Sequence, residues 1–305
     1  MPYARAWLLY DGAMSETLKG KTMVVTGGTA GIGRETVLRL VAQGADVMFV
    51  GRNRGKADAV LAEAARLGGG TASFLQGDLS SLDDVRRVAA EIRARLTRLD
   101  VLVNNAGAIF TQRQLSVDGI EMTFALNHLN YFLLTRELLP LLQASAPARI
   151  VNVASAAHVG ARVDFDDLQG ARRYRTWKAY GQSKLCNILF TYELARRLQG
   201  SGITANCLHP GFVASEFGDN NSFFSRLAIQ IAKTVGAIGV GNGAKTSVYL
   251  ATSPEVEGRT GGYYAKSRPA KSTARSHDQL AAHRLWTVSE TMVAPEASRQ
   301  FASVT

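Results

Sequence analysis

Apolar and polar positions change their spacing along this chain in a repeating way. Short runs of consecutive apolar residues end at glycine, asparagine or aspartate, and longer stretches with helical spacing of apolar residues follow them. A short apolar run bounded by turn residues is typical of a buried parallel strand, and the helical spacing is typical of a surface helix. The runs predict strands at 23–26, 45–50, 72–76, 99–103, 149–153, 204–208 and 262–265.

The stretches between these runs predict helices at 34–43, 56–67, 83–96, 119–142, 180–198, 243–251 and 279–288. Strands that alternate with helices indicate an α/β fold, here a single Rossmann-type doubly wound parallel sheet with helices on both faces. We find no internal repeat and no linker, and we predict one domain over 18–292. We assign 1–17 to an N-terminal extension and 293–305 to a C-terminal tail, which we expect to be disordered from Pro295 on.

The first predicted strand runs into a glycine-rich turn with the spacing Gly27-x-x-x-Gly31-x-Gly33, and a helix follows. Glycines let the backbone approach a pyrophosphate, and the N-terminus of the helix offers it unpaired N–H groups. Glycine is also the ordinary choice wherever a strand-to-helix loop needs a positive φ. The turn therefore favours a dinucleotide site and leaves an ordinary loop open.

The end of the second predicted strand bears on the choice of cofactor. In NAD-binding folds a carboxylate at this point holds the ribose 2′-hydroxyl, whereas an arginine accommodates the 2′-phosphate of NADP. Here Gly51 and Arg52 end the strand, and the nearest acids, Asp46 and Asp58, lie at its start and in the next helix. We expect NADP(H) in preference to NAD(H), with an exposed loop arginine as the alternative.

Two further strand ends carry polar residues. Asp78 follows the third strand and Asn104 follows the fourth. A doubly wound sheet binds its ligand beyond the carboxyl ends of the strands, so we expect both residues to lie near the adenine and its ribose. Taken singly, each is an ordinary turn former.

Tyr180 and Lys184 lie four residues apart, which places them on one face of a helix. The pKa of a free tyrosine is about 10, and a neighbouring ammonium group favours the phenolate and lowers that pKa. A shift of about three units corresponds to roughly 4 kcal/mol, within reach of one close lysine and a cationic nicotinamide. The pair is therefore a candidate general acid for a carbonyl oxygen, or a general base for an alcohol.

Tyr174 and Lys178 have the same spacing but lie in a polar, arginine-rich insert at 160–176. We prefer Tyr180 and Lys184, because an apolar-periodic helix follows them. Ser155, at the end of the fifth strand, is a candidate hydrogen-bond partner of the substrate oxygen, with a helix cap as the alternative.

The composition excludes several other functions. The chain of 305 residues is 46% apolar and 20% charged, which is ordinary for a globular protein. The formal net charge of +10 is dispersed and no nucleic-acid-binding module accompanies it, so we expect no nucleic-acid partner. The five histidines lack metal-ligand spacing, and we expect no metal. Cys186 and Cys207 lie in apolar runs, which indicates buried thiols in a reducing compartment, the cytoplasm.

Two other features suggest chemistry without completing it. Residues 239–246 resemble a P-loop, but Ala244 separates the glycine from the lysine and no clear strand precedes them. Asp164, Asp166 and Asp167 form an acidic cluster without a catalytic partner in view, which we interpret as a solvated loop.

The same residues stand in the order typical of the short-chain dehydrogenase/reductases, which the chain resembles over roughly 18–292. The resemblance rests on Thr26-Gly27-x-x-x-Gly31-Ile32-Gly33, Asp78-Leu79, Asn104-Asn105-Ala106-Gly107, Asn127, Ser155, Tyr180-x-x-x-Lys184 and Pro210-Gly211. Within that family the chain looks most like the retinol dehydrogenase group. Three features indicate this group. They are the amino-acid sequences of 183–198 and 208–211, the residues Gly51-Arg52-Asn53, and the span of 25 positions from Ser155 to Tyr180.

The resemblance implies a role for each matching residue. Tyr180 acts as the acid/base, Lys184 holds the nicotinamide ribose and tunes Tyr180, Ser155 steadies the substrate carbonyl, and Asn127 helps to relay protons. Gly27, Gly31 and Gly33 cradle the pyrophosphate, and Asp78 and Asn104 face the adenine and its ribose. The other positions implied to contact the cofactor are Thr29, Ile32, Arg52, Leu79, Ala106, Gly107, Pro210 and Gly211.

Residues and resemblance together predict an NADP(H)-dependent oxidoreductase. It would transfer a hydride between the nicotinamide and a carbonyl/alcohol pair of an apolar substrate, such as a retinal-like aldehyde or a ketone. The alternative is a non-catalytic NADP(H)-binding regulatory protein, although such relatives usually lose the tyrosine or the lysine. Helices 119–142 and 180–198 resemble those that form a dimer interface in this family and admit a homodimer. No apolar run reaches the roughly 18 residues of a membrane span, so we expect no transmembrane anchor.

Overall fold

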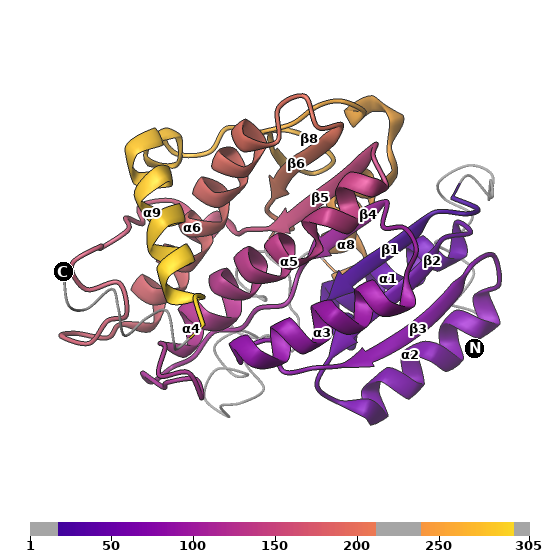
Figure 1. Ribbon diagram of the computed structural model, residues 1–305, viewed down its shortest axis with the longest axis horizontal. Helices are drawn as coiled ribbons and strands as arrows, with labels where there is room; N and C mark the ends of the chain where they lie inside the picture. The colour runs from indigo at the N-terminus through magenta and orange to yellow at the C-terminus, as the bar shows by residue number, and fades with distance from the viewer. Residues whose placement is uncertain (1–17, 212–238, 296–305) are drawn as a thin grey trace.

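The computed structural model describes residues 18–211 and 239–295. The predicted extension 1–17, the stretch 212–238 and nearly all of the predicted tail lie outside the described residues. Within the described part, one sheet of eight strands runs through the molecule in the order β3-β2-β1-β4-β5-β6-β7-β8 (Figure 1). The strands are Thr22–Thr26, Asp46–Gly51, Thr71–Gln76, Val101–Asn104, Ala148–Val153, Ile203–Leu208, Tyr263–Ala265 and Arg268–Pro269, numbered β1 to β8 in that order.

Every neighbouring pair from β3 to β7 is parallel, and only β8 pairs antiparallel, with β7. The order reverses between β1 and β4, as in a doubly wound sheet, which confirms the predicted fold. The sequence did not predict β8. This short strand follows a turn in which Lys266 and Ser267 both have a positive φ, of 52° and 55°, a conformation that neither residue type signals.

Helices cover both faces of the sheet, as predicted. They are α1 (Gly31–Ala42), α2 (Arg54–Leu67), α3 (Leu82–Arg95), α4 (Met122–Phe124), α5 (Asn130–Ala144), α6 (Thr176–Arg197), α8 (Val240–Thr252) and α9 (Gln279–Met292). Short 3₁₀ turns lie at Ala156–His158, Pro254–Val256 and Ala274–His277, and a π-helical turn at Ala125–Leu129 joins α4 to α5.

Alternate strand residues enter two separate cores. Val24 and Leu102 pack with α3, α5, α6 and α9 on the side facing the viewer in Figure 1. Val25 and Val103, their neighbours along the same strands, pack with α1, α2 and α8 on the other side. Because both faces of the central strands are buried, these strands read as continuous apolar runs rather than as alternating ones.

Several helices begin a few residues away from the predicted start, and two of these shifts bear on the site. Gly119 has a φ of +72° and lies in a turn, so the predicted helix 119–142 starts only at Met122. The buried carboxylate of Glu121 caps this start by accepting hydrogen bonds from the backbone N–H groups of Thr123 and Phe124, at 2.8 and 2.9 Å. Helix α6 begins at Thr176, four residues before Tyr180, so Tyr180 lies in its second turn. None of the helices in the described ranges has the length and apolar character needed to cross a bilayer.

Candidate active site

The carboxyl ends of the strands gather the predicted residues at one edge of the sheet. Asn104 is paired in register with Asn152, and Val153 with Leu208, so the loops after β4, β5 and β6 lie side by side. The glycine turn after β1 adjoins them at the point where the strand order reverses. This edge therefore holds Gly27, Gly107, Ser155 and the Pro210-Gly211 pair that follows β6.

The glycine turn is tightly closed. Gly27 and Gly31 have φ values of +68° and +54°. A Cβ on Gly33 would lie 2.2 Å from the carbonyl oxygen of Gly27, and one on Gly27 would lie 2.9 Å from the Cα of Ala106. Helix α1 starts here, and its N-cap residue, Ala30, provides no side-chain cap. The first N–H groups of α1 are thus available to an anion, and the turn fits a pyrophosphate.

The loop after β4 is fastened to this turn by Thr26. Its hydroxyl accepts hydrogen bonds from the backbone N–H groups of Asn105 and Ala106, at 2.8 and 3.0 Å. The side-chain amide of Asn105 donates back to the Thr26 carbonyl at 2.8 Å. Asn105 is a positioning residue that sequence reasoning missed, since within its motif nothing distinguishes it from Asn104.

The end of β2 lies against the glycine turn. A Cβ on Gly51 would lie 2.6 Å from the Cγ2 atom of Thr29. The next residue, Arg52, is exposed, and no carboxylate of the described residues forms an ion pair with it. Asp46 accepts a hydrogen bond from Thr71, and Asp58 forms an ion pair with Arg54 at 2.8 Å. A cation without a competing carboxylate therefore stands at this strand end.

The remaining predicted cofactor residues differ in how far their side chains are buried. Asp78 is half-buried, and its carboxylate accepts hydrogen bonds from the backbone and the hydroxyl of Ser80. Ile32 is half-buried in the first turn of α1. Leu79 is buried in the core, and the fully buried Asn104 side chain donates to Asn152 at 2.9 Å. Leu79 and Asn104 therefore offer only backbone to the edge of the sheet, where sequence reasoning expected Asn104 to face the adenine and its ribose.

Asn127 lies in the π-helical turn. Its side chain forms two hydrogen bonds with the backbone of Ala108 and donates to the Ser183 hydroxyl at 3.1 Å. A Cβ on Gly107 would lie 3.1 Å from the Asn127 amide oxygen and 3.5 Å from the Lys184 Nζ atom. The structure thus brings Asn127, Gly107 and Lys184 together. π turns occur frequently at functional sites, and this one was not predicted from the spacing of apolar residues.

Tyr180 and Ser155 meet at the end of β5. Their side chains are hydrogen-bonded to each other, and the Ser155 hydroxyl also accepts from the backbone N–H of Ala157 at 3.1 Å. Burial raises the pKa of Tyr180 to about 12, and the hydrogen bond with Ser155 opposes this rise. The phenol therefore holds its proton in the protein alone.

Lys184 is almost fully buried beneath Tyr180. Its Nζ atom donates to the Val153 carbonyl at 3.0 Å and lies 5.7 Å from the centroid of the Tyr180 ring. Burial lowers the pKa of this amine to about 7. The lowering of the Tyr180 pKa that we expect from Lys184 and a bound cationic nicotinamide together stays a prediction, and in the chain alone burial raises that pKa. The reason is desolvation, which disfavours the phenolate and the ammonium group alike.

The alternative pair is separated. The Tyr174 hydroxyl donates to the Phe110 carbonyl at 2.8 Å, whereas Lys178 forms an ion pair with Asp164 at 2.8 Å. The acidic cluster lies in a partly exposed loop, and its members make contacts at the surface. Asp167 accepts from the backbone N–H of Ala171 at 2.7 Å, and Asp166 lies 3.9 Å from Arg284. These contacts fold the insert against α6 and α9.

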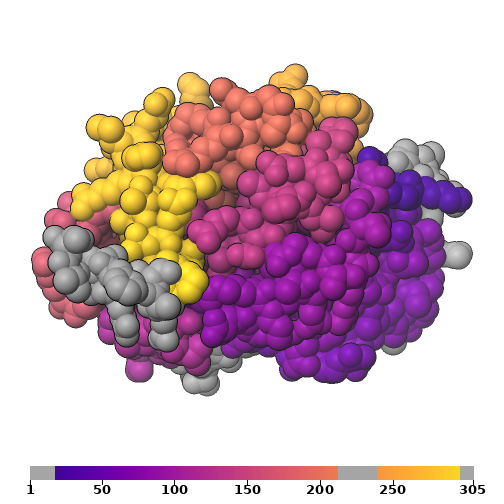
Figure 2. All heavy atoms as spheres, viewed as in Figure 1, coloured from indigo at the N-terminus to yellow at the C-terminus, as the bar shows by residue number. Residues whose placement is uncertain are grey.

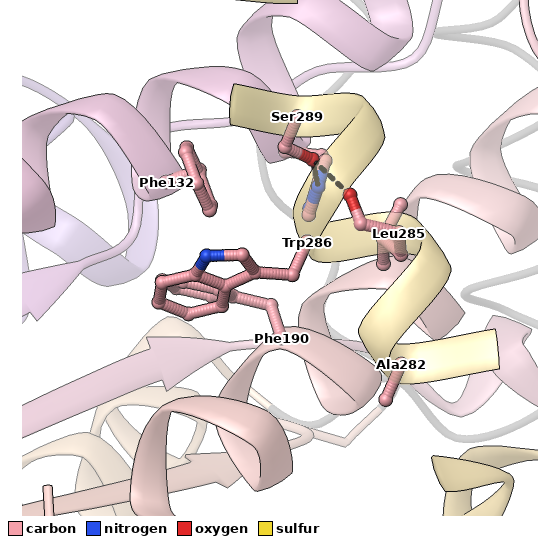
Figure 3. A pocket seen from close by; sticks show the side chains of 7 residues that line it. Phe132, Phe190, Ala282, Leu285, Trp286 and Ser289 are labelled. Carbon is pink, nitrogen blue, oxygen red and sulfur yellow. Dashed lines mark hydrogen bonds between the residues drawn. The ribbon is translucent and has the colours of Figure 1, made fainter. Parts of the chain in front are cut away.

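A chain of buried polar groups leads from the site to α9. The Asn127 carbonyl accepts from the Asn187 amide at 2.9 Å, and the Asn187 amide oxygen lies 3.3 Å from Nδ1 of His128. Nε2 of His128 lies 3.0 Å from the Ser289 hydroxyl, which donates to the Leu285 carbonyl (Figure 3). Burial lowers the pKa of His128 to about 4. Sequence reasoning did not single out this histidine, because its hydrogen-bond partners come from two distant helices, α6 and α9.

Both cysteines are buried and unpaired, as expected. In the described part of the chain, no group of three or more histidine, cysteine or acidic side chains is arranged to hold a metal ion. Residues 239–246, which resemble a P-loop, lie at the start of α8, whose N-cap residue is Gly239. The residues before them, 212–238, lie outside the described residues.

Comparison with known protein families identifies the family to which the chain belongs. The family model described as short chain dehydrogenase matches residues 21–223. The chain belongs to the short-chain dehydrogenase family. Within the family, this short-chain dehydrogenase resembles the retinol dehydrogenase group. It is 40% identical over 290 residues to retinol dehydrogenase 13 from Homo sapiens, which covers 92% of this chain and 87% of the relative.

Solved structures of the same family share the fold. An uncharacterised protein from Mycobacterium paratuberculosis superimposes with a TM-score of 0.72 and 32% identity, over 90% of this chain and 94% of that one. RhlG from Pseudomonas aeruginosa, solved as an NADP active-site complex, gives a TM-score of 0.66 and 28% identity, over 83% and 96%. This short-chain dehydrogenase is thus an oxidoreductase whose fold implies a nicotinamide cofactor.

Proposed function

We propose that this protein is an NADP(H)-dependent reductase or dehydrogenase acting on the carbonyl/alcohol pair of a largely apolar substrate. The observation that carries the proposal is the hydrogen-bonded pair of Ser155 and Tyr180, with Lys184 beneath it, beside the closed glycine turn. The presence of both Tyr180 and Lys184 speaks against a non-catalytic nucleotide-binding protein. The buried, unpaired cysteines support a reducing compartment, and we place the protein in the cytoplasm.

The residues at the sheet edge fit the cofactor. The uncapped N-terminus of α1 and the turn at Gly27, Gly31 and Gly33 would hold the pyrophosphate. Arg52 would pair with a 2′-phosphate, because an exposed guanidinium without a neighbouring carboxylate favours NADP(H) over NAD(H). The complex of RhlG with NADP, a relative of the same fold, supports this preference. The bound nicotinamide supplies or accepts the hydride.

The protein's own side chains manage the proton. In reduction, Ser155 would hydrogen-bond the substrate oxygen and Tyr180 would donate its phenolic proton to that oxygen. The raised pKa of Tyr180 keeps the phenol protonated at neutral pH, which suits a proton donor. Proton donation leaves Tyr180 as a phenolate. The protonated amine of Lys184, 5.7 Å from the phenol ring, would stabilise this phenolate.

The direct test mixes purified protein with NADPH or NADH and a panel of lipophilic aldehydes and ketones. We expect oxidation of NADPH with at least one aldehyde, and a lower kcat/KM with NADH. No oxidation of either cofactor across the panel, with NADPH binding intact in a titration, would instead favour a binding protein.

A further inference from the structure

A basic cleft opens beside the reacting groups. It is open to solvent, has a volume of about 770 Å³ and is defined here by Arg162, Arg173, Arg175, Trp177, Lys178 and Arg275. Its walls come from the segment after Ser155, from the insert leading into α6, and from the segment before α9. The volume is in the range of pockets that hold small organic molecules, about 300–1,000 Å³.

The charge of the cleft is largely unneutralised. Lys178 is paired with Asp164, and Arg275 donates to the Ala161 carbonyl at 3.3 Å. For the guanidinium groups of Arg162, Arg173 and Arg175, no ion pair is formed with any carboxylate in the described ranges 18–211 and 239–295. Like charges gathered in one cleft raise the local concentration of anions and speed their arrival.

The wall of the cleft packs against the catalytic groups. Ala157, in its wall, donates its backbone N–H to the Ser155 hydroxyl. The ring of Trp177 lies 6.3 Å from the ring of Tyr180, edge to face. A Cβ on Gly181 would lie 2.7 Å from the Ala157 carbonyl oxygen, so this wall packs directly on α6 next to Tyr180.

The distances define the shape of a ligand that would use both features. Arg175 precedes Tyr180 by five residues, which at the helical rise corresponds to roughly 8 Å along α6. Trp177, which is 52% exposed, lies between Arg175 and Tyr180 in the sequence. Val159, which is 67% exposed, also lines the cleft. A molecule with its carbonyl at Tyr180 would lay an apolar chain on these two side chains and reach the arginines at its far end.

We propose that the substrate carries an oxyanion group, a carboxylate, sulfate or phosphate, at the end remote from its carbonyl, and that the basic cleft binds this group. The inference rests on the proposed carbonyl chemistry and specifies its substrate class. Arginine suits the role because its planar donors match such oxyanions in pairs. A cleft whose wall packs against Ser155 and Tyr180 favours a small molecule that reaches both features over a membrane surface.

The test compares two substrates that differ only in this charge, a long-chain aldehyde with a terminal carboxylate and its methyl ester. In the wild type we expect kcat/KM for the carboxylate to exceed that for the ester at least tenfold, and the ratio to fall with added salt. In the double variant Arg173→Gln, Arg175→Gln the ratio falls towards one, mainly through KM for the carboxylate. Arg172→Gln, exposed and outside the cleft, keeps the wild-type ratio and is the matched control.

A second measurement is independent of turnover. Titration calorimetry with decanoate should show binding to the wild type that weakens at least tenfold in the double variant and is unchanged in Arg172→Gln. Thermal unfolding of all variants verifies that they are folded.

The outcomes separate the two proposals. If neutral aldehydes are reduced and the carboxylate gains nothing, the anionic substrate is wrong and the carbonyl chemistry stands. If no aldehyde is reduced, the proposed function fails, and the substrate inference fails with it, whatever decanoate does. If Arg173 and Arg175 govern sedimentation with phosphatidylserine vesicles but not the substrate ratio, the cleft is a membrane contact and the inference is overturned.

Discussion

Burial decides the protonation of the two reacting side chains. It raises the pKa of Tyr180 to about 12 and lowers that of Lys184 to about 7, so both favour their neutral forms in the chain alone. The sequence spacing correctly indicated that the two residues share a helix face. It could not indicate the desolvation, because the groups that bury them, Val153, Tyr131 and Gly107, come from distant segments.

The Lys184→Met variant tests whether burying the Lys184 amine lowers the free energy of unfolding. The unfolded chain binds the lysine proton up to about pH 10.5 and the folded chain only up to about 7, so the free energy of unfolding rises with pH between these values. Removing the amine should raise the free energy of unfolding at pH 7, by on the order of 2 kcal/mol, after losing the hydrogen bond to Val153. Turnover should fall at least about 100-fold.

Urea unfolding and steady-state kinetics measure both effects. Lys245→Met, on the exposed face of α8, is the control and should change neither. A Lys184→Met variant that is less stable than the wild type would show that the buried amine is not a cost to folding.

Arg52→Ala tests the choice of cofactor. Loss of a charge-assisted contact to a 2′-phosphate is worth about 1.5–3 kcal/mol, so kcat/KM for NADPH should fall by roughly 10- to 100-fold while that for NADH changes little. Arg54→Ala removes an arginine that is already paired with Asp58 and should leave the ratio of the two cofactors unaltered. An equal loss with NADPH and NADH would argue against a role at the 2′-position.

At the level of whole elements, the apolar periodicity located the first seven strands and the main helices, including α9. It failed where a local backbone feature overrides the pattern, as at the positive φ of Gly119 and the π turn that carries Asn127. A π-helical turn contains one residue more than an α-helical turn, and the spacing of apolar positions does not indicate this extra residue. The link from Asn127 through His128 to α9 escaped prediction for the related reason that tertiary packing creates it.

His128 makes the attachment of α9 sensitive to acid. The unfolded chain binds a proton at His128 below about pH 6.5 and the folded chain only below about 4, because the folded site buries the ring. The free energy of unfolding should therefore decrease as the pH falls from 6.5 to 4, by on the order of 3 kcal/mol from this group.

Urea titrations across this window measure the slope. His128→Gln should remove most of this group's contribution to the slope, and His283→Gln, on the exposed side of α9, should retain the wild-type dependence. The same slope in His128→Gln as in the wild type would contradict the assignment.

At the scale of the whole molecule, α9 lies over α5 and α6, the helices that resemble those of a dimer interface in the family. Trp286 packs edge-on against Phe132 of α5 and face-on against Phe190 of α6, with ring centroids 5.0 and 5.9 Å apart (Figure 3). Figure 2 shows this yellow segment at the surface beside the segments of α5 and α6. A partner molecule would have to displace α9 to use the same face.

We therefore expect the protein to sediment as a monomer at micromolar concentration. Sedimentation velocity over a range of concentrations measures this directly. A dimer that survives dilution and dissociates on substitution of residues on α5 and α6 would restore the interface that the family resemblance implies.

The central claim is that Tyr180 delivers the proton to the substrate oxygen. Single-turnover oxidation of bound NADPH by an aldehyde measures this step in the wild type, Tyr180→Phe and Tyr174→Phe. We expect Tyr180→Phe to lose about 100- to 10,000-fold in rate at an unchanged Kd for NADPH, and Tyr174→Phe, whose hydroxyl is engaged by Phe110, to remain near the wild-type rate. Equal rates in Tyr180→Phe and the wild type would contradict the claim.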